Sequence, residues 1–234
     1  MLRMQPTYID DFTRPFKLSA KTTALVVIDL QNASGKRGFG LGRLLAQQGR
    51  LAEAEYRFAR IDNLIVPNVE RLLATFRHAG AKVMFVTYGA NSPDFSDAPV
   101  HLKPWLVATH NCVGQPEHEI VAELRPQPGE LILNKTTMGA FASTGIEMHL
   151  RSMGITELVA VGVSTNNCVG MTAMEAADRQ FGVALVSDAT GTCSDAMQEA
   201  TLATFRRLWG RVMSSDEVIG EIRAQASPAV AKAS

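Results

Sequence analysis

The stretch HLRSMGITELVAVGVSTNNCVG, residues 149–170, decides what kind of fold this chain adopts. It opens with an amphipathic segment that ends at Gly154, and a glycine just past a helix supplies the left-handed position at which the helix stops. The run that follows is apolar and rich in β-branched residues, as in a strand buried on both faces. A polar link, STNN, then leads to Cys168 and a second amphipathic segment. The stretch therefore predicts a helix, a buried strand and another helix in succession.

The same order of amphipathic segment, glycine and apolar run recurs elsewhere. It is seen in RLLATFRHAG–AKVMFVTY (71–88), in AADRQFG–VALVSDA (176–189) and, more weakly, in ATFRRLWG–RVMS (203–214). With the apolar runs ALVVIDL (24–30) and ELILN (130–134), the chain has about six strands that alternate with helices. The expected helices cover 62–79, 117–124, 143–153, 168–181, 195–209 and 215–224.

Continuous apolar strands separated by helices predict an α/β fold of three layers, α-β-α, around a six-stranded, mostly parallel, Rossmann-like sheet. We expect an N-terminal arm over 1–20, a single domain over 21–225 and a C-terminal tail over 226–234. Two stretches, 33–60 and 89–116, fit no element, and connections of that length are usually functional or disordered.

The amino-acid composition indicates which kinds of binding partner to expect. Lysine plus arginine and aspartate plus glutamate number 23 each, a balance that gives no basic surface for nucleic acid or an anionic membrane. No stretch approaches the ~20 apolar residues of a membrane span, and the N-terminal sequence has no signal-peptide run. Three cysteines make no disulfide framework. These features favour a cytoplasmic protein that acts on a small molecule.

Three reactive side chains follow three predicted strands. Asp29 closes ALVVID, Lys135 follows LILN, and Cys168 follows LVAVGV after the link STNN. Ligands of open parallel sheets bind outside the carboxyl ends of the strands, so these residues are expected to meet at one edge. Each has an alternative role on its own: a cysteine is often inert packing, an aspartate a turn residue and a lysine a solvated charge. Together they provide a base, a cation and a nucleophile.

The position of Cys168 distinguishes it from the other cysteines. It lies at the start of the predicted helix over 168–181, where the helix dipole favours a thiolate and lowers the thiol pKa. The tetrapeptide NCVG also occurs around Cys112, but there it follows no strand and begins no helix. Cys193 is expected in packing or a loop. The context of Cys168 therefore indicates the nucleophile.

The sequence resembles the isochorismatase-like cysteine hydrolases. This superfamily includes nicotinamidases, N-carbamoylsarcosine amidases, ureidoacrylate amidohydrolases and biuret hydrolases. The matching segments run in family order from about residue 22 to about residue 215. They are ALVVIDLQN, NKTTMGAFASTGIEMHLRSMGI, GVSTNNCVGMTAMEAADRQFG and VSDAT.

The resemblance implies a catalytic triad of Asp29, Lys135 and Cys168. It also implies a cis peptide bond between Val163 and Ser164, which places the N–H groups of Ser164 and Cys168 side by side as an oxyanion hole. The reaction expected from it is cleavage of a C–N bond, amide, ureido or carbamoyl, through a thioester on Cys168.

Two departures from the family pattern bear on the site. Nicotinamidases carry an Asp and His metal cluster after the first strand, whereas residues 33–50 here contain neither type, so we expect no metal and no cofactor. Many relatives have Asp-Phe where this chain has Ala33–Ser34, which concerns the substrate pocket more than the triad.

Alternatives remain open at this stage. One is an isochorismatase-type vinyl-ether hydrolase, which does not need the thiol; another is a catalytically silent binding module on the same fold. A thiol-redox role lacks a nearby resolving cysteine. Candidate pocket residues are Phe39, Tyr88, Trp105 and Phe141, and Arg37 is a candidate partner for a substrate carboxylate. The helix-like apolar spacing of residues 41–61 predicts a homodimer or homotetramer.

Overall fold

The computed structural model describes residues 8–226 of the chain. The six predicted strands are present and form one sheet in the order β3-β2-β1-β4-β5-β6, with every neighbouring pair parallel. This arrangement confirms the predicted Rossmann-like α/β fold. The strands are β1 (Thr23–Ile28), β2 (Lys82–Tyr88), β3 (Leu131–Lys135), β4 (Glu157–Val163), β5 (Gly182–Gly191) and β6 (Arg211–Met213).

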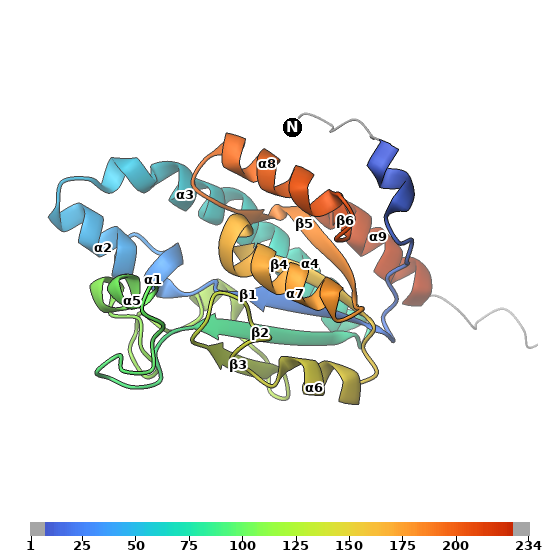
Figure 1. Cartoon of the computed structure of the whole chain (residues 1–234), viewed down its shortest axis with the longest axis horizontal. Helices are drawn as coiled ribbons and strands as arrows, with labels where there is room; N and C mark the ends of the chain where they lie inside the picture. The colour runs from blue at the N-terminus through green and yellow to red at the C-terminus, as the bar shows by residue number, and fades with distance from the viewer. Residues whose placement is uncertain (1–7, 227–234) are drawn as a thin grey trace, which may run out of the picture.

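Helices cover both faces of this sheet, as Figure 1 shows. One face carries α4 (Val66–His78) and α9 (Ser215–Ala226), and the other carries α6 (Ile146–Ser152), α7 (Gly170–Asp178) and α8 (Asp195–Arg206). These helices agree with five of the six expected ones. The three-layer arrangement buries the strands on both sides, which explains why their sequences are continuously apolar.

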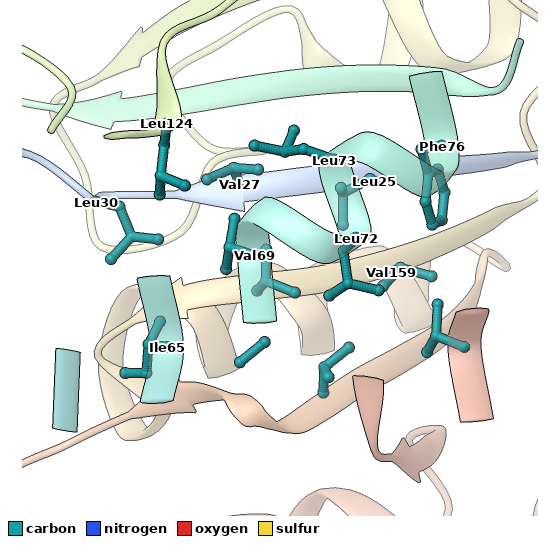
Figure 2. Packing of buried hydrophobic residues seen from close by; sticks show 14 of the residues in the cluster. Leu25, Val27, Leu30, Ile65, Val69, Leu72, Leu73, Phe76, Leu124 and Val159 are labelled. Carbon is teal, nitrogen blue, oxygen red and sulfur yellow. The ribbon is translucent and has the colours of Figure 1, made fainter. Parts of the chain in front are cut away.

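The core alternates along each strand. In β1, Leu25 and Val27 belong to the cluster on the α4 side, whereas Val26 belongs to the cluster on the opposite face. Figure 2 shows Val69 and Leu72 of α4 beside these β1 residues. Burying one side chain of this kind contributes roughly 1.5–3 kcal/mol. The strands β1 and β4, which lead to Asp29 and Cys168, are therefore held by packing on both faces, whereas the edge strand β3, which ends at Lys135, leaves Ile132 50% exposed.

Short helices form a cap beyond the carboxyl ends of the strands. The cap consists of α1 (Asn32–Gly35), α2 (Gly40–Gln47), the 3₁₀ turn η2 (Leu51–Ala54), α3 (Glu55–Arg60) and α5 (Lys103–Thr109). In Figure 1, α1, α2 and α5 lie past the arrowheads of β1 and β2. A π-helical turn, η3 (Ile61–Ile65), joins α3 to α4. The stretch 33–60, to which the sequence assigned no element, is thus largely helical, whereas 89–116 holds only α5 and otherwise consists of turns and irregular backbone.

The helix expected over 117–124 is wrong, because only a 3₁₀ turn, η4 (Ala122–Leu124), forms there. The carbonyls that a helix would use point elsewhere: Glu117 O and Glu119 O accept the N–H groups of Ala33 and Asn32 at 2.8 and 2.9 Å. Tertiary hydrogen bonds to the cap have replaced the helical ones in this segment.

Residues 8–20 of the predicted arm pack against the domain. Leu18 is fully buried, and its N–H donates to Glu221 Oε2 at 2.9 Å. The Arg211 guanidinium lies 5.4 Å above the ring centre of Phe16. The predicted tail lies outside the described residues except for Ala226, and the expected division of the chain stays a prediction. Within 8–226, no helix is long and apolar enough to cross a membrane.

Candidate active site

The strand order places the site. The chain leaves β1 toward β2 and β3 on one side, and then returns to the other side of β1 with β4. The carboxyl ends of β1 and β4 are therefore the topological switch point, where such sheets bind ligands. Asp29 directly follows β1, and Ser164 directly follows β4. Asp29 has a φ of 53°, in the left-handed region that aspartate adopts more readily than most residues.

Asp29 and Lys135 form a buried ion pair. Lys135 Nζ lies 2.9 Å from Asp29 Oδ2, and the two side chains are 0% and 7% exposed. Lys135 ends β3, with β2 between it and β1, so the Lys135 and Asp29 side chains together bridge about two strand spacings, ~10 Å. Its Nζ lies 4.3 Å from the ring centre of Tyr88 and also donates a hydrogen bond to Thr137 O at 3.2 Å. A shorter side chain would not reach.

Cys168 lies in a π-helical turn, η5 (Thr165–Val169), between β4 and α7. Its side chain is almost fully buried, and Sγ lies 3.6 Å from Met138 Sδ. Asp29 and Lys135 lie close enough to the thiol to shift its pKa in opposite directions, so the three residues form one cluster. The structure thus brings together the three residues that the sequence placed at strand ends.

Burial dominates the electrostatics of this cluster. It raises the pKa of the Cys168 thiol to about 12; Asp29 adds to the rise and Lys135 opposes it. Burial also raises the pKa of Asp29, against the attraction of the Lys135 ammonium. The pKa of Lys135 is raised because the Asp29 and Cys168 anions outweigh its own burial. The low thiol pKa expected at a helix start is therefore not found, because burial raises the pKa of Cys168 instead.

The peptide bond between Val163 and Ser164 is cis. Ser164 has an extended backbone and directly precedes η5 as its N-cap, and its carbonyl accepts the N–H groups of Asn167 and Val169 at 3.0 and 3.2 Å. Ser164 and Cys168 both line the cavity described next.

A cavity of about 500 Å³ opens over the cluster, lined by Asp29, Cys168 and residues of the cap. Two of the four candidate pocket residues, Tyr88 and Trp105, line it. The other two do not line it. Phe39 directly precedes α2, and the ring of Phe141 packs in the core with its centre 6.1 Å from the ring centre of Phe181. Arg37 is paired with Glu55 and Asp62 and does not line the cavity either.

The structure adds polar residues that the sequence did not single out. Gln31, Ser34, Arg57, Asn111 and Thr192 line the cavity. Ser34 is the second of the two residues that stand where many relatives have Asp-Phe, and its Oγ donates to Asp29 O at 3.0 Å. Thr192 directly follows β5, and Gln31 lies shortly after β1, so strand ends could have indicated both. Arg57 lies in the short helix α3 and Asn111 in a loop, where no strand end or repeated pattern marks them. Cys193, expected in packing or a loop, also lines the cavity.

No group of three or more potential metal ligands of the types His, Cys, Asp and Glu occurs among residues 8–226. The absence of a metal remains an expectation from residues 33–50.

The fold and the cluster define a doubly wound α/β protein with a cysteine beside a buried carboxylate–lysine pair. Residues 23–217 match the family model of the isochorismatase domain. This chain therefore belongs to the isochorismatase family.

Similar proteins agree with this assignment. The chain is 27% identical over 220 residues to the ureidoacrylate amidohydrolase RutB of Variovorax paradoxus, covering 88% of this chain and 83% of the relative. The N-carbamoylsarcosine amidase of Thermoplasma acidophilum has a solved structure with 27% identity and a TM-score of 0.63, over 83% of this chain and 97% of that one. A cysteine hydrolase from Pseudomonas syringae, with a TM-score of 0.76 and 22% identity over 90% of this chain and 97% of that one, shares the fold.

Proposed function

We propose that this protein is a cysteine hydrolase that cleaves a C–N bond, amide or ureido, in a small metabolite. The observation that carries the proposal is the cluster at the cavity floor. A buried thiol, Cys168, lies with a carboxylate, Asp29, whose charge is balanced by the Lys135 ammonium at 2.9 Å. An acid–base group next to a nucleophile is the arrangement that covalent catalysis requires.

The first half of the reaction begins at the thiol. Asp29 accepts the Cys168 proton as Sγ attacks the carbonyl carbon of the substrate. The N–H groups of Ser164 and Cys168 donate to the developing oxyanion, which stabilises it by roughly 3–4 kcal/mol per donor. The C–N bond then breaks, and Asp29 returns its proton to the departing nitrogen. The products are a free amine or ammonia and a thioester on Cys168.

The second half releases the acyl or carbamoyl group. Asp29 takes a proton from water as the water oxygen attacks the thioester carbonyl. The S–C bond breaks, and the proton returns from Asp29 to Sγ, which restores the thiol. Lys135 stays protonated throughout and keeps Asp29 oriented between the two steps.

The names of the relatives support this substrate class. The chain is similar to a ureidoacrylate amidohydrolase and to an N-carbamoylsarcosine amidase, and both names denote hydrolysis of an amide-type bond. Loss of a triad member would favour a silent binding module, and none is lost here.

The test is incubation with a panel of amides, ureides and carbamoyl compounds, with release of ammonia or amine as the readout. Cys168→Ala is expected to lower kcat by at least about 10³-fold, because no other group supplies the nucleophile. Cys112→Ala is the matched control, since Cys112 is buried in a separate cluster with Leu102 and Leu106. Retained hydrolysis in Cys168→Ala, or its loss in Cys112→Ala, would refute the assignment.

We further propose that the enzyme works in the cytoplasm as a homodimer or homotetramer. A reducing compartment keeps the nucleophile as a free thiol, and all three cysteines are free in the structure. The proposed oligomer rests on the apolar surface of the cap, where Val107 of α5 is 44% exposed.

A further inference from the structure

Arg57 of α3 faces the cavity without a negatively charged partner. Its Nη1 donates to Ser164 Oγ at 2.8 Å, and its Nε donates to Ser34 O at 3.0 Å. Both acceptors are neutral. Among residues 8–226, no carboxylate forms an ion pair with this guanidinium, although burial disfavours its charge and lowers its pKa. An arginine remains protonated at neutral pH, so a positive charge stays in the cavity wall.

Three other arginines of the cap have carboxylate partners. Arg37 pairs with Glu55 and Asp62, Arg43 pairs with Glu117, and Arg50 pairs with Glu53. None of these three lines the cavity. These three arginines are thus neutralised by carboxylates of the protein. Arg60, the last residue of α3, also lies outside the cavity and donates instead to the carbonyls of Thr190 and Ser187. Arg57 differs from all four because its unpaired charge lines the cavity.

The other charges of the cavity are already balanced. Asp29 is paired with Lys135, and Glu53 is paired with Arg50. The cavity therefore carries one uncompensated positive charge, at Arg57. Burial of an unpaired charge is costly, and the guanidinium plane fits a carboxylate with two parallel hydrogen bonds.

Besides Asp29 Oδ1, two further polar atoms in the same cavity have no hydrogen-bond partner among the described residues. Tyr88 Oη and Asn111 Oδ1 are buried and make no hydrogen bond among the described residues. Both residues line the cavity and are at least nine-tenths buried. Buried polar atoms are almost always satisfied, so these two positions call for hydrogen-bonding groups on a ligand. A carbonyl and N–H groups, as in an amide or a ureide, provide them.

We infer that Arg57 binds a carboxylate of the substrate, so that the substrate is an amido or ureido acid. The inference rests on the proposed C–N hydrolase and names its substrate class. Arg57 donates to the side chain of Ser164, which directly follows β4 and lines the same cavity as Cys168. It thereby holds the acid group near the carbonyl under attack, and it is the specificity-determining residue of the site.

The test compares an acid with its neutral counterpart, N-carbamoyl-β-alanine and its methyl ester. In the native enzyme kcat/KM is higher for the acid. Arg57→Gln lowers kcat/KM for the acid by about 10- to 100-fold, the range for a lost charge-assisted pair, and changes that for the ester by less than about threefold. Arg57→Lys, which keeps the charge, restores part of the preference. Arg37→Gln, which breaks an ion pair outside the cavity, leaves the preference intact.

An equal loss for acid and ester in Arg57→Gln would show that Arg57 acts only by holding Ser164, and would overturn the inference. Equal kcat/KM values for acid and ester in the native enzyme would overturn the inference too. Cleavage of the C–N bond of the ester would in that case still support the proposed C–N hydrolase.

Binding separates this inference from the reaction itself. In Cys168→Ala, titration calorimetry is expected to show tighter binding of the acid than of the ester, and Arg57→Gln in that background removes the difference. If neither probe is hydrolysed, this difference still supports the acid site. Its absence overturns the inference.

Discussion

At the scale of single residues, Lys135 has the most specific predicted effect. The ammonium balances Asp29 at 2.9 Å and opposes the rise of the Cys168 pKa. Lys135→Met keeps most of the volume but removes the charge, so Asp29 takes up a proton and is lost as a base. We expect kcat to fall by at least about 100-fold, the usual contribution of a positioned acid–base group. The pH at which iodoacetamide begins to alkylate Cys168 rises.

The matched control is Lys82→Met, because Lys82 is exposed at the start of β2, the opposite end of the sheet. It is expected to leave kcat and the alkylation profile unchanged. An unaltered alkylation profile in Lys135→Met would remove Lys135 from the charge network and leave an Asp29–Cys168 pair.

Asp29 determines the acid side of the pH dependence. Burial raises its pKa above the ordinary value of 3.8, and the base is active only when ionised. As the pH falls, activity is therefore lost at a higher pH than an exposed aspartate would give. We expect kcat/KM for a neutral amide to decline along a limb that lies above about pH 4. A limb at or below 3.8 would mean that Asp29 is not the essential base.

At the scale of elements, the approach of β1 and β4 sets the geometry of the site, and Gly162 permits it. Gly162 has a φ of 119°, and a Cβ there would lie 1.9 Å from Ile28 O. Gly162→Ala must push β1 away from β4 next to Asp29 and Ser164. We expect a loss of about 3 kcal/mol or more in the free energy of unfolding, measured with urea.

Gly154→Ala is the control for backbone strain alone. Gly154 also has a positive φ, 71°, but a Cβ added there would meet no heavy atom of another segment within 4 Å. Its cost should be about 1 kcal/mol. Similar losses in both variants would show that strain, rather than the contact between β1 and β4, governs Gly162.

The strands were predictable from the sequence because their signals are local. A glycine stop followed by a β-branched run identifies β2, β4 and β5 without knowledge of their neighbours. The strand ends in turn give Asp29, Lys135 and Cys168. The helix expected at 117–124 does not form, because the carbonyls of Glu117 and Glu119 accept hydrogen bonds from backbone N–H groups of the cap. A tertiary contact of this kind leaves no pattern in the sequence.

The cap was the least predictable part of the site. Its helices α1 and α3 have four and six residues, too few for an amphipathic period to be seen. Arg57 and Arg37 are both arginines of this stretch, and only the folded cap shows that Arg37 meets Glu55 and Asp62 while Arg57 meets Ser164. Their difference comes from packing, so sequence alone could not separate them.

At the scale of the whole molecule, the sheet and the cap have separate tasks. The sheet brings Asp29 and Cys168 to the switch point, and the side chain of Lys135 reaches them from the edge strand β3. The cap lines the cavity, and in the proposed function it contributes the groups that select a substrate. Chemistry therefore depends on the strand ends, while specificity depends on short helices that can vary without disturbing the core.

The cap also predicts the oligomeric state. Helix α2 packs against α5, where Leu44 and Leu45 are only partly buried and Val107 is 44% exposed. Apolar side chains gathered on one surface are typical of an interface between copies, and a stable one buries roughly 1,200–2,000 Å². Sedimentation equilibrium at micromolar concentration is expected to give two or four times the chain mass of 25.3 kDa.

A charge on that surface tests the location of the interface. Val107→Arg should lower the sedimentation mass toward a single chain, because an unpaired charge at an apolar interface is costly to bury. Met148→Arg is the control, since Met148 is 62% exposed on α6, in the layer that covers one face of the sheet rather than in the cap. If the native protein sediments as one chain, the oligomer is absent. If Met148→Arg alone dissociates it, the copies meet at α6, and the cap faces solvent with its cavity open.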